Sequence, residues 1–116
     1  MKKIGILTCL HSNDVCTRAG CLKAFHQRTD TFSEYDNETE LAVLMTCNGC
    51  EKDNPVEPED DLGLKEKLER LSKEEIAVMH VGACRLNKGI ECVRMTRICD
   101  MIKKMDISVV RGTHRE

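Results

Sequence analysis

The chain contains 116 residues, of which 33% are charged and 3% aromatic, and its formal net charge is −2. This length allows one domain, spanning residues 1–116, with a modest hydrophobic core. The balanced charge argues against nucleic-acid binding, because nucleic acid favours a strongly basic surface, and no apolar run is long enough to cross a membrane. We therefore expect neither nucleic acid nor a membrane as a partner.

Strand and helix patterns alternate along the chain. In chain order, the apolar spacing predicts a strand at 3–8, a helix at 21–28, a strand at 40–45, a helix at 64–73, a strand at 76–81, a helix at 91–105 and a strand at 107–110. The segment 51–61, rich in acidic residues and containing two prolines, predicts an exposed loop.

This alternation is typical of an α/β fold, in which helices cover a parallel sheet. We expect a small doubly wound, mostly parallel four-stranded sheet with helices on both faces and the strands in the order 2-1-3-4. In the first predicted helix, the side chains expected to point inward are Leu22 and Phe25. In the second helix they form a stripe of leucines, and in the third a stripe of methionines and isoleucines. The two stripes comprise Leu64, Leu68 and Leu71, then Met95, Ile98, Ile102 and Met105.

The N-terminus begins like a signal peptide, with two lysines before a short apolar run. The apolar run ends at Leu10, however, and polar residues follow without a cleavage pattern of small residues. We therefore expect the protein to remain in the cytoplasm. In that reducing compartment, eight cysteines indicate metal or redox chemistry rather than a framework of disulfides.

One motif joins a predicted strand to a pair of thiols. The apolar residues 41–45 are followed by Cys47-Asn48-Gly49-Cys50, and Gly49 can adopt a turn conformation that other residues avoid. A Cys-x-x-Cys pair at a strand end suits either a soft metal ion or a reversible disulfide.

The other cysteines fall at the same edge of the predicted sheet. In such a fold the ligand-binding site lies outside the carboxyl ends of the strands, where most of the cysteines and one histidine are placed by the predicted elements. The predicted metal ligands are Cys9, Cys16, Cys21, Cys47, Cys50, Cys84, Cys92 and His114. We expect Cys9, Cys47, Cys50 and Cys84 to form the inner set, with the other four completing it or forming a second site.

The remaining sulfur and imidazole groups have simpler roles. Cys99 is expected in the core beside the apolar stripe of the third helix, and His80 is expected to be buried and hydrogen-bonded. His11 and His26 are expected to be ordinary surface residues, and the acidic side chains of segment 51–61 are expected to be solvated.

These features together resemble the CGGC-domain family of small, cysteine-rich, metal-binding proteins. The resemblance covers essentially the whole chain and rests on Cys9, Cys16, residues 20–25, Phe32, Tyr35, residues 46–50, residues 76–84, Cys92 and residues 109–114. It implies metal binding but no reaction, so enzymatic activity stays open. The chain departs from the family pattern at Asn48, where glycine is usual, and at Glu51 and Val93, where proline is usual.

Zinc is the first choice of metal, because four thiolate or imidazole ligands complete its tetrahedron. An iron–sulfur cluster is the alternative, since it also takes four thiolates, although the cysteine spacing matches neither ferredoxin pattern.

Two enzymatic functions compete with metal binding. A thiol-disulfide redox enzyme would use the pair Cys47 and Cys50, but an acidic loop follows this pair where thioredoxin-like proteins have a helix. A phosphatase-like or arsenate-reductase-like enzyme would use Cys9 as nucleophile. That chemistry needs an arginine six positions after the cysteine, and Val15 stands there.

Overall fold

The computed structural model describes residues 2–114, so Met1 and residues 115–116 of the predicted domain lie outside the described part. Four parallel strands form the main sheet in the order β2-β1-β3-β6. Their bounds are β1 Lys3–Thr8, β2 Glu40–Thr46, β3 Val78–Val81 and β6 Ser108–Arg111. The predicted order 2-1-3-4 is confirmed.

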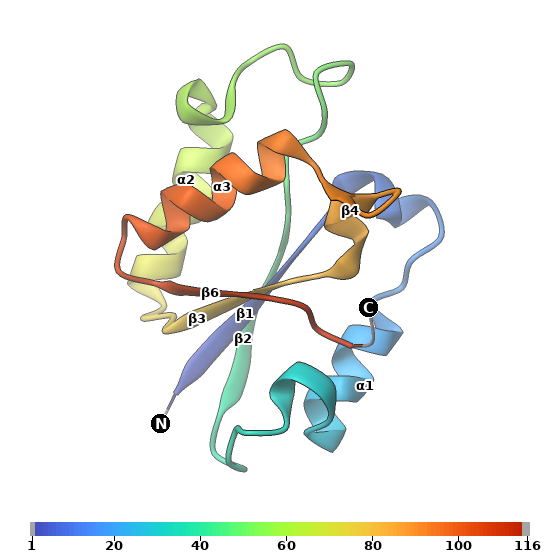
Figure 1. Ribbon diagram of the computed structural model, residues 1–116. Coiled ribbons are helices and arrows are strands. Elements are labelled where there is room, and N and C mark those ends of the chain that lie inside the picture. Colours follow the sequence, from blue (N-terminus) through green and yellow to red (C-terminus); the bar gives the residue numbers. More distant parts are fainter. Residues whose placement is uncertain (1, 115–116) are drawn as a thin grey trace.

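Helices lie on both faces of this sheet, as Figure 1 shows. Helix α1 (Ala19–Gln27) covers one face, and α2 (Leu62–Lys73) and α3 (Val93–Lys103) cover the other. The predicted α/β class is therefore confirmed. No helix among residues 2–114 is both long and apolar enough to span a bilayer.

The sheet separates two hydrophobic clusters, one under each helical layer. The larger cluster joins α2 and α3 to the sheet and includes the predicted stripes Leu64, Leu68, Leu71, Met95, Ile98 and Ile102. The smaller cluster joins α1 to the opposite face through Ala24, Phe25 and Phe32. Leu22 and Met105, also predicted to point inward, are only partly buried. Burial of these aliphatic side chains is the main stabilising contribution to the fold.

Short elements connect the strands and helices. The 3₁₀ turns are η1 Leu10–Asp14, η2 Asp30–Phe32, η3 Pro58–Asp60 and η4 Ala83–Arg85. A small antiparallel hairpin, β4 (Leu86–Asn87) and β5 (Ile90–Glu91), replaces the predicted start of the third helix. Helix α3 therefore begins at Val93, and Cys92 occupies its N-cap.

Candidate metal centre

Three thiols gather where the first three strands of the sheet end. Cys9 directly follows β1, Cys47 directly follows β2, and Cys84 lies in η4 after β3. The backbone N–H of Cys9 donates to Cys84 Sγ across 3.1 Å, and that of Leu10 donates to Cys47 Sγ across 3.3 Å. The amides after β1 thus hold both neighbouring sulfurs in place.

The pKa of the Cys9 thiol is raised, first by burial and further by the nearby sulfurs of Cys47 and Cys84. Cys9, Cys47 and Cys84 thus lie at the same edge of the sheet, but their three sulfurs are not all within 4.8 Å of one another, and their binding of one ion stays a prediction. All eight cysteines of the chain are free thiols.

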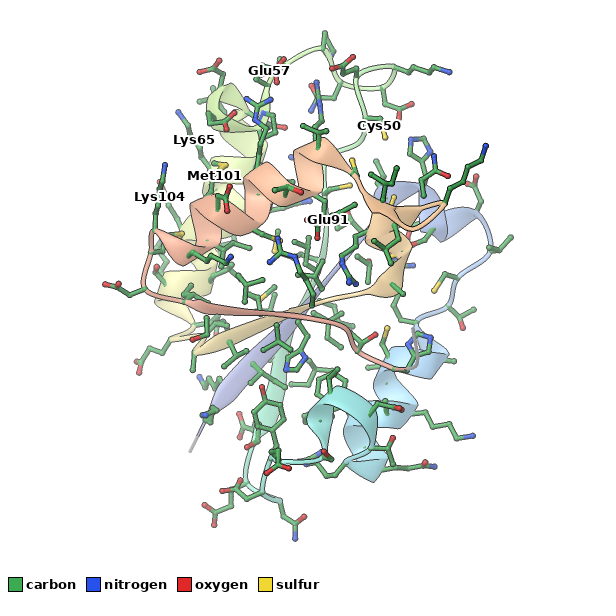
Figure 2. All side chains as sticks on the ribbon, viewed as in Figure 1. Cys50, Glu57, Lys65, Glu91, Met101 and Lys104 are labelled. Carbon is green, nitrogen blue, oxygen red and sulfur yellow. The ribbon has the colours of Figure 1, made fainter. Side chains whose placement is uncertain are left out.

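The fourth member of the predicted inner set, Cys50, lies beside a different group of residues. It opens into a pocket of about 560 Å³ lined by His11, Cys50, Glu51, Lys52, Asp53, Cys92, Val93 and Arg94. In Figure 2, Cys50 lies next to the N-terminal end of α3. The pocket therefore brings together residues that follow β1, residues that follow β2 and the start of α3.

Three possible metal donors in this pocket lie close together. The donor atoms of His11, Cys50 and Asp53 all lie within 4.8 Å of one another, and no other such group of three occurs among residues 2–114. His11 Nε2 and Asp53 Oδ2 are 2.6 Å apart. Sulfur, imidazole nitrogen and carboxylate oxygen are the three donor types that zinc accepts in proteins.

Cys92 is a neighbour of this trio. Burial is the main reason that the pKa of the Cys50 thiol is raised, and the nearby Cys92, Cys47 and Asp53 raise it further, whereas Arg94 lowers it. Cys92 also lines the same pocket. Cys50 and Cys92 therefore belong to the same pocket.

Sequence reasoning missed two members of this group. His11 is exposed, as expected, but it is not an isolated surface residue, since it contacts Asp53. Asp53 belongs to the loop whose acidic side chains were expected to be solvated. The sequence did offer one indication that His11 belongs to the site. His11 follows Cys9 by two positions and is therefore expected at the same edge of the sheet.

Several contacts fix the loop that carries Cys47 and Cys50. Gly49 has φ +95°, so the left-handed turn expected for this glycine is present. Lys67 of α2 donates from Nζ to the carbonyl oxygen of Thr46 at 2.9 Å and to Oδ1 of Asn48 at 2.6 Å. Asp61, the N-cap of α2, accepts from the side-chain amide of Asn48 at 3.1 Å. The loop is thereby tied to the start and to the middle of α2.

The remaining predicted ligands lie beside α1. Cys21 Sγ is 3.0 Å from Thr113 Oγ1 and 3.6 Å from His114 Nδ1, and burial raises the pKa of this thiol. Cys16 is exposed, and its sulfur accepts the backbone N–H of Arg18 at 3.3 Å. Cys21 and His114 are therefore neighbours near the start of α1.

Cys99 and His80 occupy the positions expected for them. Cys99 is fully buried in the core under α3. His80 is fully buried, with Nδ1 3.0 Å from the carbonyl oxygen of Gly112 and Nε2 2.7 Å from the hydroxyl of Tyr35. Because a carbonyl oxygen can only accept, Nδ1 donates to Gly112, and Nε2 accepts from Tyr35.

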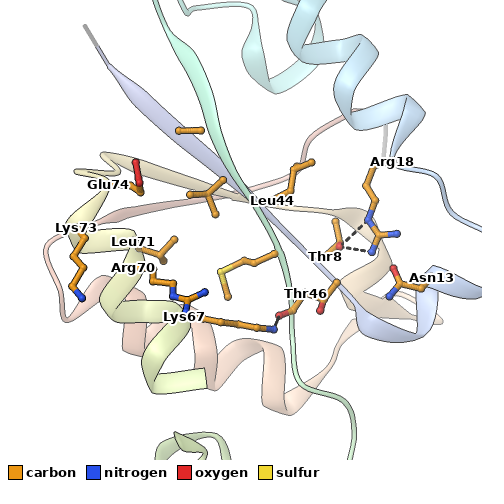
Figure 3. Close-up of a pocket in the computed structure, with 13 residues that line it drawn as sticks. Thr8, Asn13, Arg18, Leu44, Thr46, Lys67, Arg70, Leu71, Lys73 and Glu74 are labelled. Atoms are coloured by element: carbon orange, nitrogen blue, oxygen red, sulfur yellow. Dashed lines mark hydrogen bonds between the residues drawn. The ribbon is translucent and has the colours of Figure 1, made fainter. Parts of the chain in front are cut away.

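A second hollow, of about 790 Å³, runs beside the edge strand β2 and contains no cysteine in its lining (Figure 3). Lys67 reaches Thr46 from α2, and Arg18 donates to the Thr8 hydroxyl at 2.8 Å. Of these two pockets, only the one beside Cys50 is lined by cysteines.

Comparison with known proteins gives one result. A family model described as the CGGC domain matches residues 3–114. No curated protein and no solved structure matches the chain.

Proposed function

The chain belongs to the CGGC-domain family, and we propose that it binds a metal ion, zinc as the first choice, in the pocket beside Cys50. The observation that carries this proposal is the approach of His11, Cys50 and Asp53, whose donor atoms lie within 4.8 Å of one another. Three donors of these types at such separations need only small side-chain rotations to meet at one ion.

Cys92 is the proposed fourth ligand. It lines the same pocket as Cys50 and occupies the N-cap of α3. Two sulfurs, one nitrogen and one oxygen complete a tetrahedron around zinc. When bound, the ion supplies a positive charge that converts both thiols to thiolates and fixes the loop after β2 against the start of α3.

The mixed donor set favours zinc over an iron–sulfur cluster. A cluster is held chiefly by thiolates, four in the usual case. His11 and Asp53 would be unusual ligands for it. The three thiols of Cys9, Cys47 and Cys84 are the proposed place for the alternative cluster, with Cys50 as the fourth thiolate. Cys21, Cys16 and His114 offer only three donors, so we propose them as a weaker second site that loses its ion when loosely bound metal is removed.

Eight free thiols suit a reducing compartment, so the cytoplasm is the proposed location.

Metal content and absorbance together test the proposed metal binding. Protein produced in minimal medium and purified without oxygen is expected to contain about one zinc per chain and to be colourless. A brown protein that contains iron would support the cluster instead. Folded protein without metal would refute the proposal.

Thiol-disulfide exchange by Cys47 and Cys50 is the second proposed function. It is favoured by one observation, namely that Cys47 is buried while Cys50 opens to a pocket, as an attacking thiol and its resolving partner require. The raised pKa of Cys50 counts against it, because attack needs the thiolate. If Cys50→Ser keeps its metal but loses disulfide reductase activity, the redox function holds and the metal proposal fails at this residue.

A further inference from the structure

A buried arginine lines the pocket beside Cys50 without an acidic partner. Arg94 is 8% exposed, and its Nη1 donates to the carbonyl oxygen of Gly49 at a long 3.5 Å. Its Nε is buried and has no hydrogen-bond partner. No ion pair joins Arg94 to a carboxylate among residues 2–114. Burying a guanidinium without a counter-charge is costly, so the position calls for an anion.

The next arginine on the same helix shows the contrast. Arg97 lies one turn after Arg94, is partly exposed, and pairs with both Glu57 and Glu59 of the acidic loop. The loop therefore supplies carboxylates to the exposed arginine and none to the buried one. Arg94 is not simply one more contact between α3 and this loop.

The N-terminus of α3 lies at the pocket beside Cys50. Its N-cap, Cys92, makes no side-chain hydrogen bond to the first turn, and the first turn contains no acidic residue. Val93 is 72% exposed and lines the pocket. The free amides at the start of this 11-residue helix are therefore near the opening of the pocket. Unpaired N–H groups and the helix dipole both favour a negative charge at that position.

The carboxylates that line the pocket leave this positive charge uncancelled. Asp53 is paired with His11 at 2.6 Å, and Glu51 is exposed to solvent beside Lys52. A hollow of about 560 Å³ has room for a small ligand beside the metal donors. Among the described residues, Arg94 is the buried cation of this pocket without an ion pair, and the first-turn amides of α3 also lack a negative partner.

We propose that the pocket binds a small oxyanion, held by the guanidinium of Arg94 and the first-turn amides of α3. The ligand class is a sulfate-, phosphate- or carboxylate-bearing small molecule, because these groups match both donors. This inference goes beyond the proposed metal binding and does not depend on it, since neither the arginine nor the amides need a metal. With zinc present, the oxyanion lies beside Cys50 and the ion.

Inorganic sulfate is the probe that tests the inference. The full chain, reduced and freed of metal with a chelator, is titrated with sulfate at constant ionic strength, and the amide resonances of residues 93–95 are followed by NMR. We expect saturable shifts confined to the pocket. Arg94→Gln should weaken sulfate binding at least ten-fold, whereas the matched control Arg97→Gln should change it less than two-fold.

A second pair of variants keeps the test valid if Arg94→Gln fails to fold. Val93→Glu places a carboxylate in the exposed first turn of α3 without touching the buried arginine, and Val93→Gln is its uncharged control. We expect Val93→Glu to weaken sulfate binding several-fold and Val93→Gln to leave it unchanged. No saturable shift in the original chain, or equal sulfate affinity in Val93→Glu and Val93→Gln, would overturn the inference.

A zinc titration of the same samples separates the two proposals. Sulfate binding without zinc binding would support the anion pocket and refute the proposed function. Zinc binding without sulfate binding would support the proposed function and overturn the inference, because the counter-charge of Arg94 would then be the metal-bound thiolates.

Discussion

His11 Nε2 and Asp53 Oδ2 lie 2.6 Å apart although 42 positions separate the two residues in the sequence. One follows β1 and the other follows β2, and Cys50 lies within 4.8 Å of both donor atoms. Parallel strands explain this approach, because the carboxyl ends of adjacent strands open at the same edge of the sheet.

The contribution of the imidazole to metal binding can be measured directly. His11→Ala removes one of the proposed donors and is expected to weaken zinc binding by at least 10- to 100-fold, the loss typical of removing a group that only supports a ligand. Competition with a chromophoric chelator gives the affinity. The control His26→Ala changes an exposed histidine of α1 and should leave zinc binding unchanged. Equal zinc affinity in both variants would remove His11 from the site.

Glycine substitutions test whether the loop geometry matters for the metal. Gly49 and Gly89 both have positive φ, +95° and +80°, so replacing either with alanine strains the backbone by about 1 kcal/mol or more. A Cβ at Gly49 would lie 3.1 Å from Cβ of Asp53, whereas one at Gly89 would meet nothing within 4 Å. We expect both variants to lose stability but only Gly49→Ala to lose zinc affinity. A similar loss of zinc affinity in Gly89→Ala would show that general destabilisation is the cause.

Lys67 is expected to stabilise the loop after β2. Its Nζ is the donor to both Thr46 O and Asn48 Oδ1, and burial lowers the pKa of this amine. Lys67→Met keeps the length of the side chain but leaves both acceptors without their donor, so it should lower the free energy of unfolding by about 1–3 kcal/mol. Urea denaturation provides the measurement. Lys65→Met, at an exposed position of α2, is the control and should cost less than about 0.5 kcal/mol.

The buried histidine gives the fold a pH dependence. Burial lowers the pKa of His80 below its usual 6.5, against the smaller opposing effect of the Gly112 carbonyl. Below pH 6.5 the unfolded chain therefore binds a proton that the folded chain does not. The free energy of unfolding should fall between pH 7.5 and 5.5, with a slope for this one group of at most about 1.4 kcal/mol per pH unit.

His80→Gln should flatten this slope, because it removes the titrating group, while the exposed His26→Gln should leave it unchanged. Urea titrations at several pH values give the slope for each variant. An unchanged slope in His80→Gln would assign the pH dependence to other groups.

The hydrophobic pattern was enough to predict the sheet. Each strand is a short apolar run, and the leucine and isoleucine stripes of α2 and α3 repeat with helical spacing, so the order of elements and the helical layers follow from local sequence. The pattern could not show that Arg85 to Cys92 forms a hairpin before α3. Its pairing, Leu86 with Glu91 and Asn87 with Ile90, involves strands of only two residues.

The candidate site was only partly predictable. Cys9, Cys47 and Cys84 follow strand ends, so their place at one edge of the sheet could be derived from the topology alone. The position of Asp53 depends on how the acidic loop folds back, and this is decided by tertiary contacts such as Asn54 Nδ2 to Asp61 Oδ2 at 2.8 Å and the pairing of Glu59 with Arg97. Such contacts join residues that no periodicity relates, so the pairing with His11 was missed.

Zinc stoichiometry in Cys50→Ser tests the central claim most directly. Cys50 belongs to the group of three donors, whereas Cys99 is buried in the core away from the pocket and provides the control Cys99→Ala. Anaerobically purified protein is analysed for metal after removal of loosely bound ions. We predict about one zinc per chain in the original protein and in Cys99→Ala, and almost none in Cys50→Ser. Full zinc content in Cys50→Ser, or folded original protein without metal and with every thiol reactive, would contradict the account.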